Sequence, residues 1–100
     1  MNFKVKWTFL AEITYFNEME FISKKWNLKQ VNIFEELVEK EISRLSINPE
    51  IGTLKNNNLF SLIISKQIAL IYRIKKENKS IELILFWNNL KNPEDLSKFL

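Results

Sequence analysis

The side chains that could carry out chemistry in this chain are cations, tyrosines and carboxylates, because the sequence contains no histidine and no cysteine. Their absence excludes zinc and copper sites of the usual kind, a serine–histidine triad, a catalytic thiolate and a disulfide framework. A single glycine likewise excludes a P-loop and a dinucleotide-binding fingerprint. The residue types that remain for binding or catalysis are lysine, arginine, tyrosine and the carboxylates.

Charge is distributed unevenly along the chain, although the net value is only +3. Residues 1–54 hold seven basic and eight acidic side chains, whereas residues 55–100 hold eight basic and four acidic ones. The second half therefore carries the positive surface, which favours a phosphate-rich or acidic partner. The alternative is a solvated lysine face that only aids solubility.

Four glutamates gather in one segment of the first half, and such a group can serve acid–base catalysis or bind a metal. They are Glu35, Glu36, Glu39 and Glu41. Their spacing distributes them around a predicted helix instead of converging them, so we expect a solvated helix face.

Three apolar runs in residues 59–64, 68–74 and 81–87 predict the sheet that must position the cations. Each has strand length, is rich in β-branched and aromatic residues, and is bounded by residues that favour turns. The breaks between them, 65–67 and 77–80, are too short for a parallel crossover. The runs therefore predict an antiparallel meander.

The N-terminal half predicts one strand followed by two helices. Residues 3–7 alternate strictly, which indicates a half-buried edge strand with Lys4 and Lys6 on its outer face. Thr8 is the expected N-cap of the first helix, with Glu12 in its first turn. The apolar positions expected in the core are Tyr15, Met19, Ile22 and Trp26 in the first helix, flanked by Ala11 and Phe16, and Val31, Phe34, Val38, Ile42 and Leu45 in the second, supported by Leu37.

The short joint at residues 27–29 makes these helices antiparallel neighbours, whose apolar side we expect on the sheet. Pro49 ends the second helix, and the lone Gly52 is expected to adopt a backbone angle denied to other residues. Asn92 and Pro93 predict a short C-terminal helix. The sequence thus predicts one α+β domain over residues 1–100: strand, helical hairpin, three-stranded antiparallel meander and terminal helix. No run reaches the length that spans a bilayer, so we expect a cytoplasmic protein of bacterial type.

This order of elements resembles the RelE/ParE superfamily of toxins from bacterial type II toxin–antitoxin systems. The resemblance covers nearly the whole chain and rests on three stretches in this order: residues 48–52 after the second helix, residues 71–74 in a sheet strand, and residues 87–93 at its end. It implies a twisted antiparallel sheet with a helical hairpin packed against it. It also implies a cognate antitoxin that wraps the toxin with a helix and an extended segment. From the residues themselves we expect no cofactor and no metal.

The resemblance implies one of two activities. RelE-like members cut messenger RNA in the ribosome with lysine, arginine and tyrosine side chains, whereas ParE-like members poison DNA gyrase without catalytic residues. This chain departs from the pattern in two places, since Phe60 and Ser61, and also Leu90, stand where relatives often have arginine. Cleavage through the 2′-hydroxyl needs a base and cations that stabilise the phosphorane, so these losses weaken the nuclease alternative.

Strand alternation places Arg73 and Lys75 on one face and Tyr72 on the other. If helices cover the Tyr72 face, this tyrosine is a core residue and cannot act on RNA. The predicted binding residues are then Lys66, Arg73, Lys75 and Lys91, and a nuclease would use Arg73, Lys91 and Lys66. Three hypotheses follow: a ParE-like binding toxin, a RelE-like ribonuclease, and an attenuated toxin that only binds its antitoxin.

Overall fold

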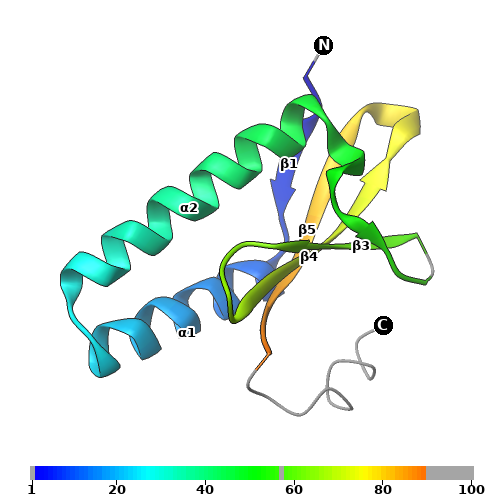
Figure 1. The fold of residues 1–100 in the computed structure, drawn as a ribbon. Helices are drawn as coiled ribbons and strands as arrows, with labels where there is room; N and C mark the ends of the chain where they lie inside the picture. Colours follow the sequence, from blue (N-terminus) through cyan, green and yellow to red (C-terminus); the bar gives the residue numbers. More distant parts are fainter. Residues whose placement is uncertain (1, 57, 90–100) are drawn as a thin grey trace.

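The computed structural model describes residues 2–56 and 58–89 of the chain. Figure 1 shows an α+β fold with the predicted order of elements. The elements are β1 (Lys4–Trp7), α1 (Phe9–Lys25), α2 (Leu28–Ile47), the 3₁₀ turn η1 (Pro49–Ile51), β2 (Thr53–Leu54), β3 (Leu59–Ile63), β4 (Ile68–Lys75), the 3₁₀ turn η2 (Lys76–Asn78) and β5 (Ser80–Asn88). The expected C-terminal helix lies outside the described residues.

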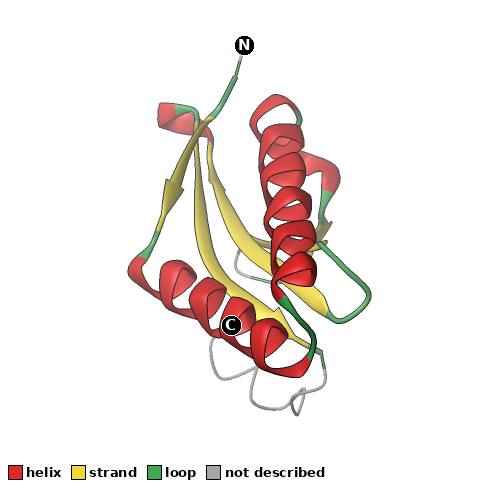
Figure 2. Cartoon of the chain, turned by 90° about the vertical axis from the view of Figure 1, so that its left-hand side faces the viewer, coloured by secondary structure: helices red, strands yellow, loops and turns green. Residues whose placement is uncertain are grey.

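One five-stranded sheet forms the centre of the described chain, in the order β1-β5-β4-β3-β2. Strands β3, β4 and β5 pair antiparallel, which confirms the predicted meander. The N-terminal strand β1 lies at an edge, as expected, and pairs in parallel with β5. The short strand β2, which the sequence did not predict, forms the opposite edge. Both helices lie on the same side of the strands (Figure 2).

Side-chain caps set the start of each helix. The Thr8 hydroxyl accepts a hydrogen bond from the Ala11 N–H at 3.1 Å, which confirms the predicted N-cap of α1. The Asn27 side chain accepts from the Gln30 N–H at 3.0 Å and begins α2 in the same way. Only Trp26 and Asn27 separate the helices, so the two form the predicted antiparallel hairpin.

The main core lies between the hairpin and the sheet, where fully buried strand residues such as Leu70, Ile81 and Leu83 meet both helices. The apolar stripe predicted for α2 is confirmed, with Ile42 at its partly buried margin. In α1 the prediction was wrong for Trp26, which is 65% exposed because it caps the helix at the turn of the hairpin, and for Phe16, which is 60% exposed. The other predicted positions of α1 belong to the core or pack against it: Ala11, Tyr15, Met19 and Ile22.

A β-bulge changes which residues of β5 face the helices. Ile71 pairs with Leu85 and Tyr72 with Leu83, so Ile84 is one extra residue on β5. Before the bulge Ile81 and Leu83 face the helices, and after it Phe86 does. A second apolar cluster consequently forms on the opposite face of the sheet from Leu59, Ile71, Leu85 and Trp87.

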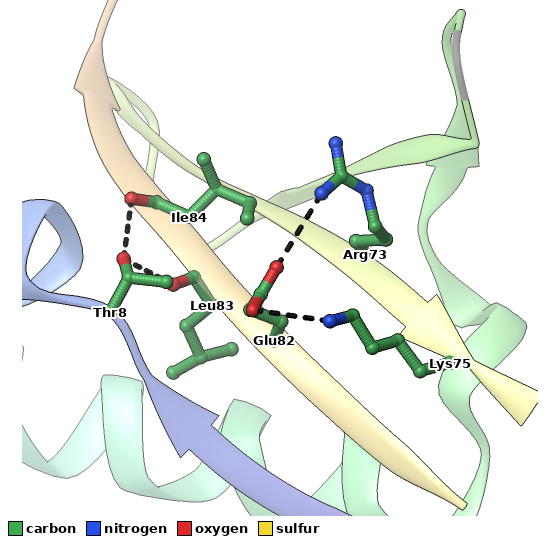
Figure 3. A network of polar contacts seen from close by, with 6 residues as sticks. All are labelled: Thr8, Arg73, Lys75, Glu82, Leu83 and Ile84. Atoms are coloured by element: carbon green, nitrogen blue, oxygen red, sulfur yellow. Dashed lines mark hydrogen bonds and ion pairs between the residues drawn. The ribbon is translucent and has the colours of Figure 1, made fainter. Parts of the chain in front are cut away.

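Two threonines of the α1 segment bind the backbone of β5 around this bulge. Thr8 Oγ1 donates to the Leu83 carbonyl at 2.7 Å and lies 3.1 Å from the Ile84 carbonyl (Figure 3). Thr14 Oγ1 accepts from the Phe86 N–H at 2.9 Å. These hydrogen bonds fix α1 to the last strand, just past the point where the pairing of β5 with β1 ends.

Gly52 departs from expectation, because its φ of −78° and ψ of 177° are open to any residue. Its role lies in close approach: a Cβ atom there would lie 2.6 Å from the Tyr72 hydroxyl oxygen and 2.9 Å from the Ser61 carbonyl oxygen. The absence of a side chain thus lets the segment after α2 pass against the sheet.

Candidate functional site

Tyr72 is a core residue, as expected from the helices covering its face of the sheet. Its side chain is completely buried and stacks on Phe60 with ring centroids 5.4 Å apart. The hydroxyl donates to the Pro49 carbonyl at 2.7 Å and accepts from the Gly52 N–H at 3.0 Å. Burial raises the pKa of this phenol, an effect partly opposed by the Gly52 N–H. Both hydrogen bonds of the hydroxyl serve the fold, so Tyr72 cannot contact RNA.

Arg73 and Lys75 share the opposite face of β4, as predicted, and both interact with Glu82 of β5. Arg73 Nη1 lies 3.5 Å from one carboxylate oxygen of Glu82, and Lys75 Nζ lies 3.6 Å from the other. Figure 3 shows the carboxylate of Glu82 directed between the two cations. The cation side chains are each 40% exposed and that of Glu82 is 28% exposed, so all three are open to solvent. Sequence reasoning did not identify Glu82.

Two lysines from the start of the chain join this group. In the parallel pairing of β1 with β5, Lys6 lies beside Glu82 and Lys4 beside Ser80. In the antiparallel pairing on the other side of β5, Arg73 lies beside Glu82 and Lys75 beside Ser80. Paired residues of neighbouring strands project to the same face of a sheet. We call the resulting surface the open-face patch, and its residues are Lys4, Lys6, Arg73, Lys75 and Glu82.

The alternation of residues 3–7 already placed Lys4 and Lys6 together, but the sequence did not say which strand β1 would join. Sequence reasoning therefore missed their proximity to Arg73 and Lys75. Neighbouring strands are about 4.8 Å apart and alternate residues about 7 Å, so the four cations span roughly 10 Å by 7 Å. One carboxylate against four cations gives this face a local excess of positive charge.

The structure does not bring all the predicted site residues together. Lys66 lies in the turn between β3 and β4, at the end of β4 opposite Lys75. The five residue steps from Ile68 to Arg73 alone extend about 17 Å, so Lys66 cannot act with Arg73 on one group. Lys91 lies outside the described residues. Arg73 and Lys75 are thus the two predicted residues that the structure places side by side.

The glutamates of α2 do not converge, and within the described ranges no group of three or more acidic, histidine or cysteine side chains could hold a metal ion. The expectation of a solvated face was wrong for Glu41, which is buried. Both of its carboxylate oxygens accept from Arg44 Nη1, at 2.8 and 2.9 Å. Arg44 lies one helical turn after Glu41, and its positive charge offsets the free-energy cost of burying this carboxylate.

A second buried carboxylate lies at the far end of β5. Glu18 of α1 accepts a hydrogen bond at 3.2 Å from Asn88 Nδ2, and both residues are buried. Asn88 belongs to one of the stretches that carry the family resemblance, but the sequence gave no reason to expect that it would bond to Glu18 of the first helix. This contact fixes the last residue of β5 to α1.

Apolar side chains are exposed around the turn of the helical hairpin. Trp26 is 65% exposed and Leu28 70% exposed. Beside them a groove of about 150 Å³ lies between the hairpin and the β3–β4 turn, lined by Ile22, Trp26, Gln30, Ile33, Phe34, Leu37 and Ser65. Large exposed apolar groups of this kind mark surfaces that bind other proteins.

A larger hollow of about 690 Å³ lies next to the edge strand β2. Gly52, Leu54, Phe60 and Ile74 line it. An ion pair between Lys76 Nζ and Glu50, at 3.1 Å, joins the two 3₁₀ turns beside it. This hollow and the outer edge of β2, at which the sheet of the described residues ends, together form a surface that could receive an extended chain.

Comparison of the fold with solved structures identifies its type. The chain superposes on a chain of the chromosomal ParDE TA system of P. aeruginosa with a TM-score of 0.72 at 13% identity, over 86% of this chain and 95% of that one. It matches a chain of the RelBE2 toxin–antitoxin complex of Mycobacterium tuberculosis with a TM-score of 0.62 at 20% identity, over 88% and 99%. A double mutant of the E. coli toxin RelE in the free state gives 0.64 at 15% identity, over 97% and 93%.

The chain has the RelE/ParE fold. The fold that the sequence resemblance implied is therefore confirmed. No family model and no curated protein matches the sequence. Within residues 2–56 and 58–89, no helix of this chain is long and apolar enough to cross a membrane.

Proposed function

We propose that this protein is the toxin of a type II toxin–antitoxin pair and that it inhibits growth in the ParE manner, by binding its target without catalysis. The observation that favours the ParE-like mode over the RelE-like one is how the polar side chains of β4 are bonded. The Tyr72 hydroxyl is held by Pro49 and Gly52, while Arg73 and Lys75 are both directed at Glu82. The buried Tyr72 hydroxyl therefore cannot supply the acid or base that RNA cleavage requires.

DNA gyrase is the candidate target, because ParE-like toxins act on it. Purified protein at micromolar concentration should inhibit supercoiling of relaxed plasmid by gyrase. Unaffected supercoiling would refute gyrase as the target.

The RelE-like alternative is tested with a translating extract in which cleavage of a reporter transcript is followed. We expect no ribosome-dependent cleavage. If the wild-type protein cuts and the Arg73→Ala variant does not, the protein is a ribonuclease and the binding mode proposed here is wrong. Cutting by both proteins would also contradict the binding mode and would place catalysis in other residues.

The expected partner is a cognate antitoxin encoded beside the toxin. Two features support such a partner. The groove at the hairpin turn presents Trp26 and Ile33 to an amphipathic helix, and the hollow beside β2 offers a sheet edge to an extended segment. Co-expression with the neighbouring gene and affinity purification should yield a stoichiometric complex. Recovery of the chain alone, with both proteins soluble, would contradict this partner.

A further inference from the structure

The open-face patch has the chemistry of a surface for a nucleic-acid backbone. Its four cations come from two separate strands on either side of β5, and the residues between them are Ser80 and Glu82. Protein interfaces derive most of their affinity from buried apolar or aromatic anchors, which these central positions lack. Flexible lysines and one arginine instead match phosphates, which bind proteins through charge and without reading sequence.

Glu82 occupies the place that a phosphate would take in this arrangement. Its two oxygens each face one cation, as the oxygens of a phosphate do when they bind arginine and lysine. The separations of 3.5 and 3.6 Å exceed those of strong charge-assisted hydrogen bonds, which are about 2.7–2.9 Å. The carboxylate is thus held loosely, in contact with solvent, and can turn away when a stronger anion arrives.

We propose that the open-face patch binds the phosphate backbone of nucleic acid and that Glu82 weakens this binding by competing with phosphate for Arg73 and Lys75. Glu82 is then a residue that limits the affinity of the protein for nucleic acid. This inference concerns the isolated protein and goes beyond the proposed function, since it requires neither growth arrest nor a particular target.

The test measures binding of a fluorescein-labelled DNA duplex of about 20 base pairs, and of a single-stranded RNA of about 20 nucleotides, by fluorescence anisotropy at several salt concentrations. The Glu82→Gln variant should bind about two- to fivefold more tightly than the wild type, as expected from removing a competitor with the strength of an exposed ion pair. With the duplex, the slope of log K against log salt should steepen by about one to two, because each freed cation adds one phosphate contact.

The matched control is Glu50→Gln, which removes the same charge from another lysine-paired glutamate outside the patch. If Glu50→Gln strengthens binding as much as Glu82→Gln, only net charge matters and the role of Glu82 is refuted. No measurable binding of either probe by wild type and Glu82→Gln at low salt would refute the patch itself. Comparing the two probes shows whether the backbone source is duplex DNA or single-stranded RNA, and binding of either supports the proposal.

A second pair of variants tests the lysines of β1. Replacing Lys4 and Lys6 together with glutamine in the Glu82→Gln background should reduce affinity about tenfold or more and make the salt slope shallower by up to two. Replacing Lys24 and Lys25, which lie in the last turn of α1, removes the same charge away from the patch and should have a smaller effect. Equal effects of the two pairs would show that β1 does not contribute to the binding surface.

Discussion

Replacing Gly52 with alanine should strongly destabilise the fold, although the backbone angles at this position suit alanine. The added methyl group would meet the Tyr72 hydroxyl oxygen at 2.6 Å and the Ser61 carbonyl oxygen at 2.9 Å. Neither neighbour can move freely, because Tyr72 is completely buried and the Ser61 carbonyl belongs to the paired strand β3. The segment after α2 must therefore move away from the sheet.

The expected cost combines two effects. Overpacking a buried site costs about 1–3 kcal/mol. Moving this segment also breaks the hydrogen bonds of the Tyr72 hydroxyl to Gly52 and Pro49, worth about 1 kcal/mol in net terms. The free energy of unfolding should fall by about 2–4 kcal/mol, which lowers the melting temperature by roughly 10–20 °C in a domain of this size.

Urea unfolding followed by circular dichroism measures this change, with Thr53→Ala as the control at an exposed neighbouring position. Tyr72→Phe alone should cost about 1–2 kcal/mol, since it leaves the Gly52 N–H and the Pro49 carbonyl without their partner. In the Tyr72→Phe background, Gly52→Ala should cost at least about 1 kcal/mol less than in the wild type, because the closest clash is gone. A cost of Gly52→Ala below about 0.5 kcal/mol, or strictly additive costs, would refute the close-approach explanation.

Three further predictions concern other contacts. Thr8→Val should lower the free energy of unfolding by about 1–3 kcal/mol, because it removes the cap of α1 and the hydrogen bonds to β5, whereas Thr53→Val should change it by less than about 0.5 kcal/mol in the same urea titration. Burial raises the pKa of Tyr72 above its usual value of 10.0, so the folded state favours the neutral phenol. That contribution is complete below about pH 10 and is lost as the pH rises through the raised pKa, so alkaline unfolding monitored by fluorescence should be less steep for Tyr72→Phe. Trp26→Ser should leave the melting temperature unchanged but weaken antitoxin binding about tenfold or more in calorimetry, whereas Phe9→Ser, at the exposed opposite end of α1, should leave binding unchanged.

Local patterns were sufficient to predict the elements of this fold. Period-two and helical spacing located β1, both helices and the meander, and Thr8 was recognisable as a cap from its position alone. The same patterns correctly predicted that Tyr72 is buried, because Arg73 and Lys75 are charged and must lie on the other face of the strand. What failed was local as well: Trp26 follows the apolar period of α1, but it falls at the turn, where no sheet residue can cover it.

The candidate site was harder to predict, because it depends on which strands become neighbours. Lys4 and Lys6 lie some seventy residues before Arg73 and Lys75, and only the parallel pairing of β1 with β5 unites them. The role of Glu82 depends on the same register. Lys66 shows the converse, since it is close to Arg73 in sequence but an extended strand separates them. The sequence marks Gly52 as the only glycine, but it does not show why a glycine is needed there. The need comes from the close approach of Tyr72, which lies twenty residues further along the chain.

The most direct test of the proposed toxin role is growth of a bacterial culture on tightly induced expression of this chain, alone and together with its genomic neighbour. Expression alone should arrest growth, with filamentation and an SOS response as the sign of gyrase poisoning, and co-expression of the neighbour should restore growth. Rapid loss of translation instead of filamentation would favour mRNA cleavage and contradict the binding mode. Undiminished growth with soluble protein present would contradict the toxin role itself and favour an attenuated protein that only binds its antitoxin.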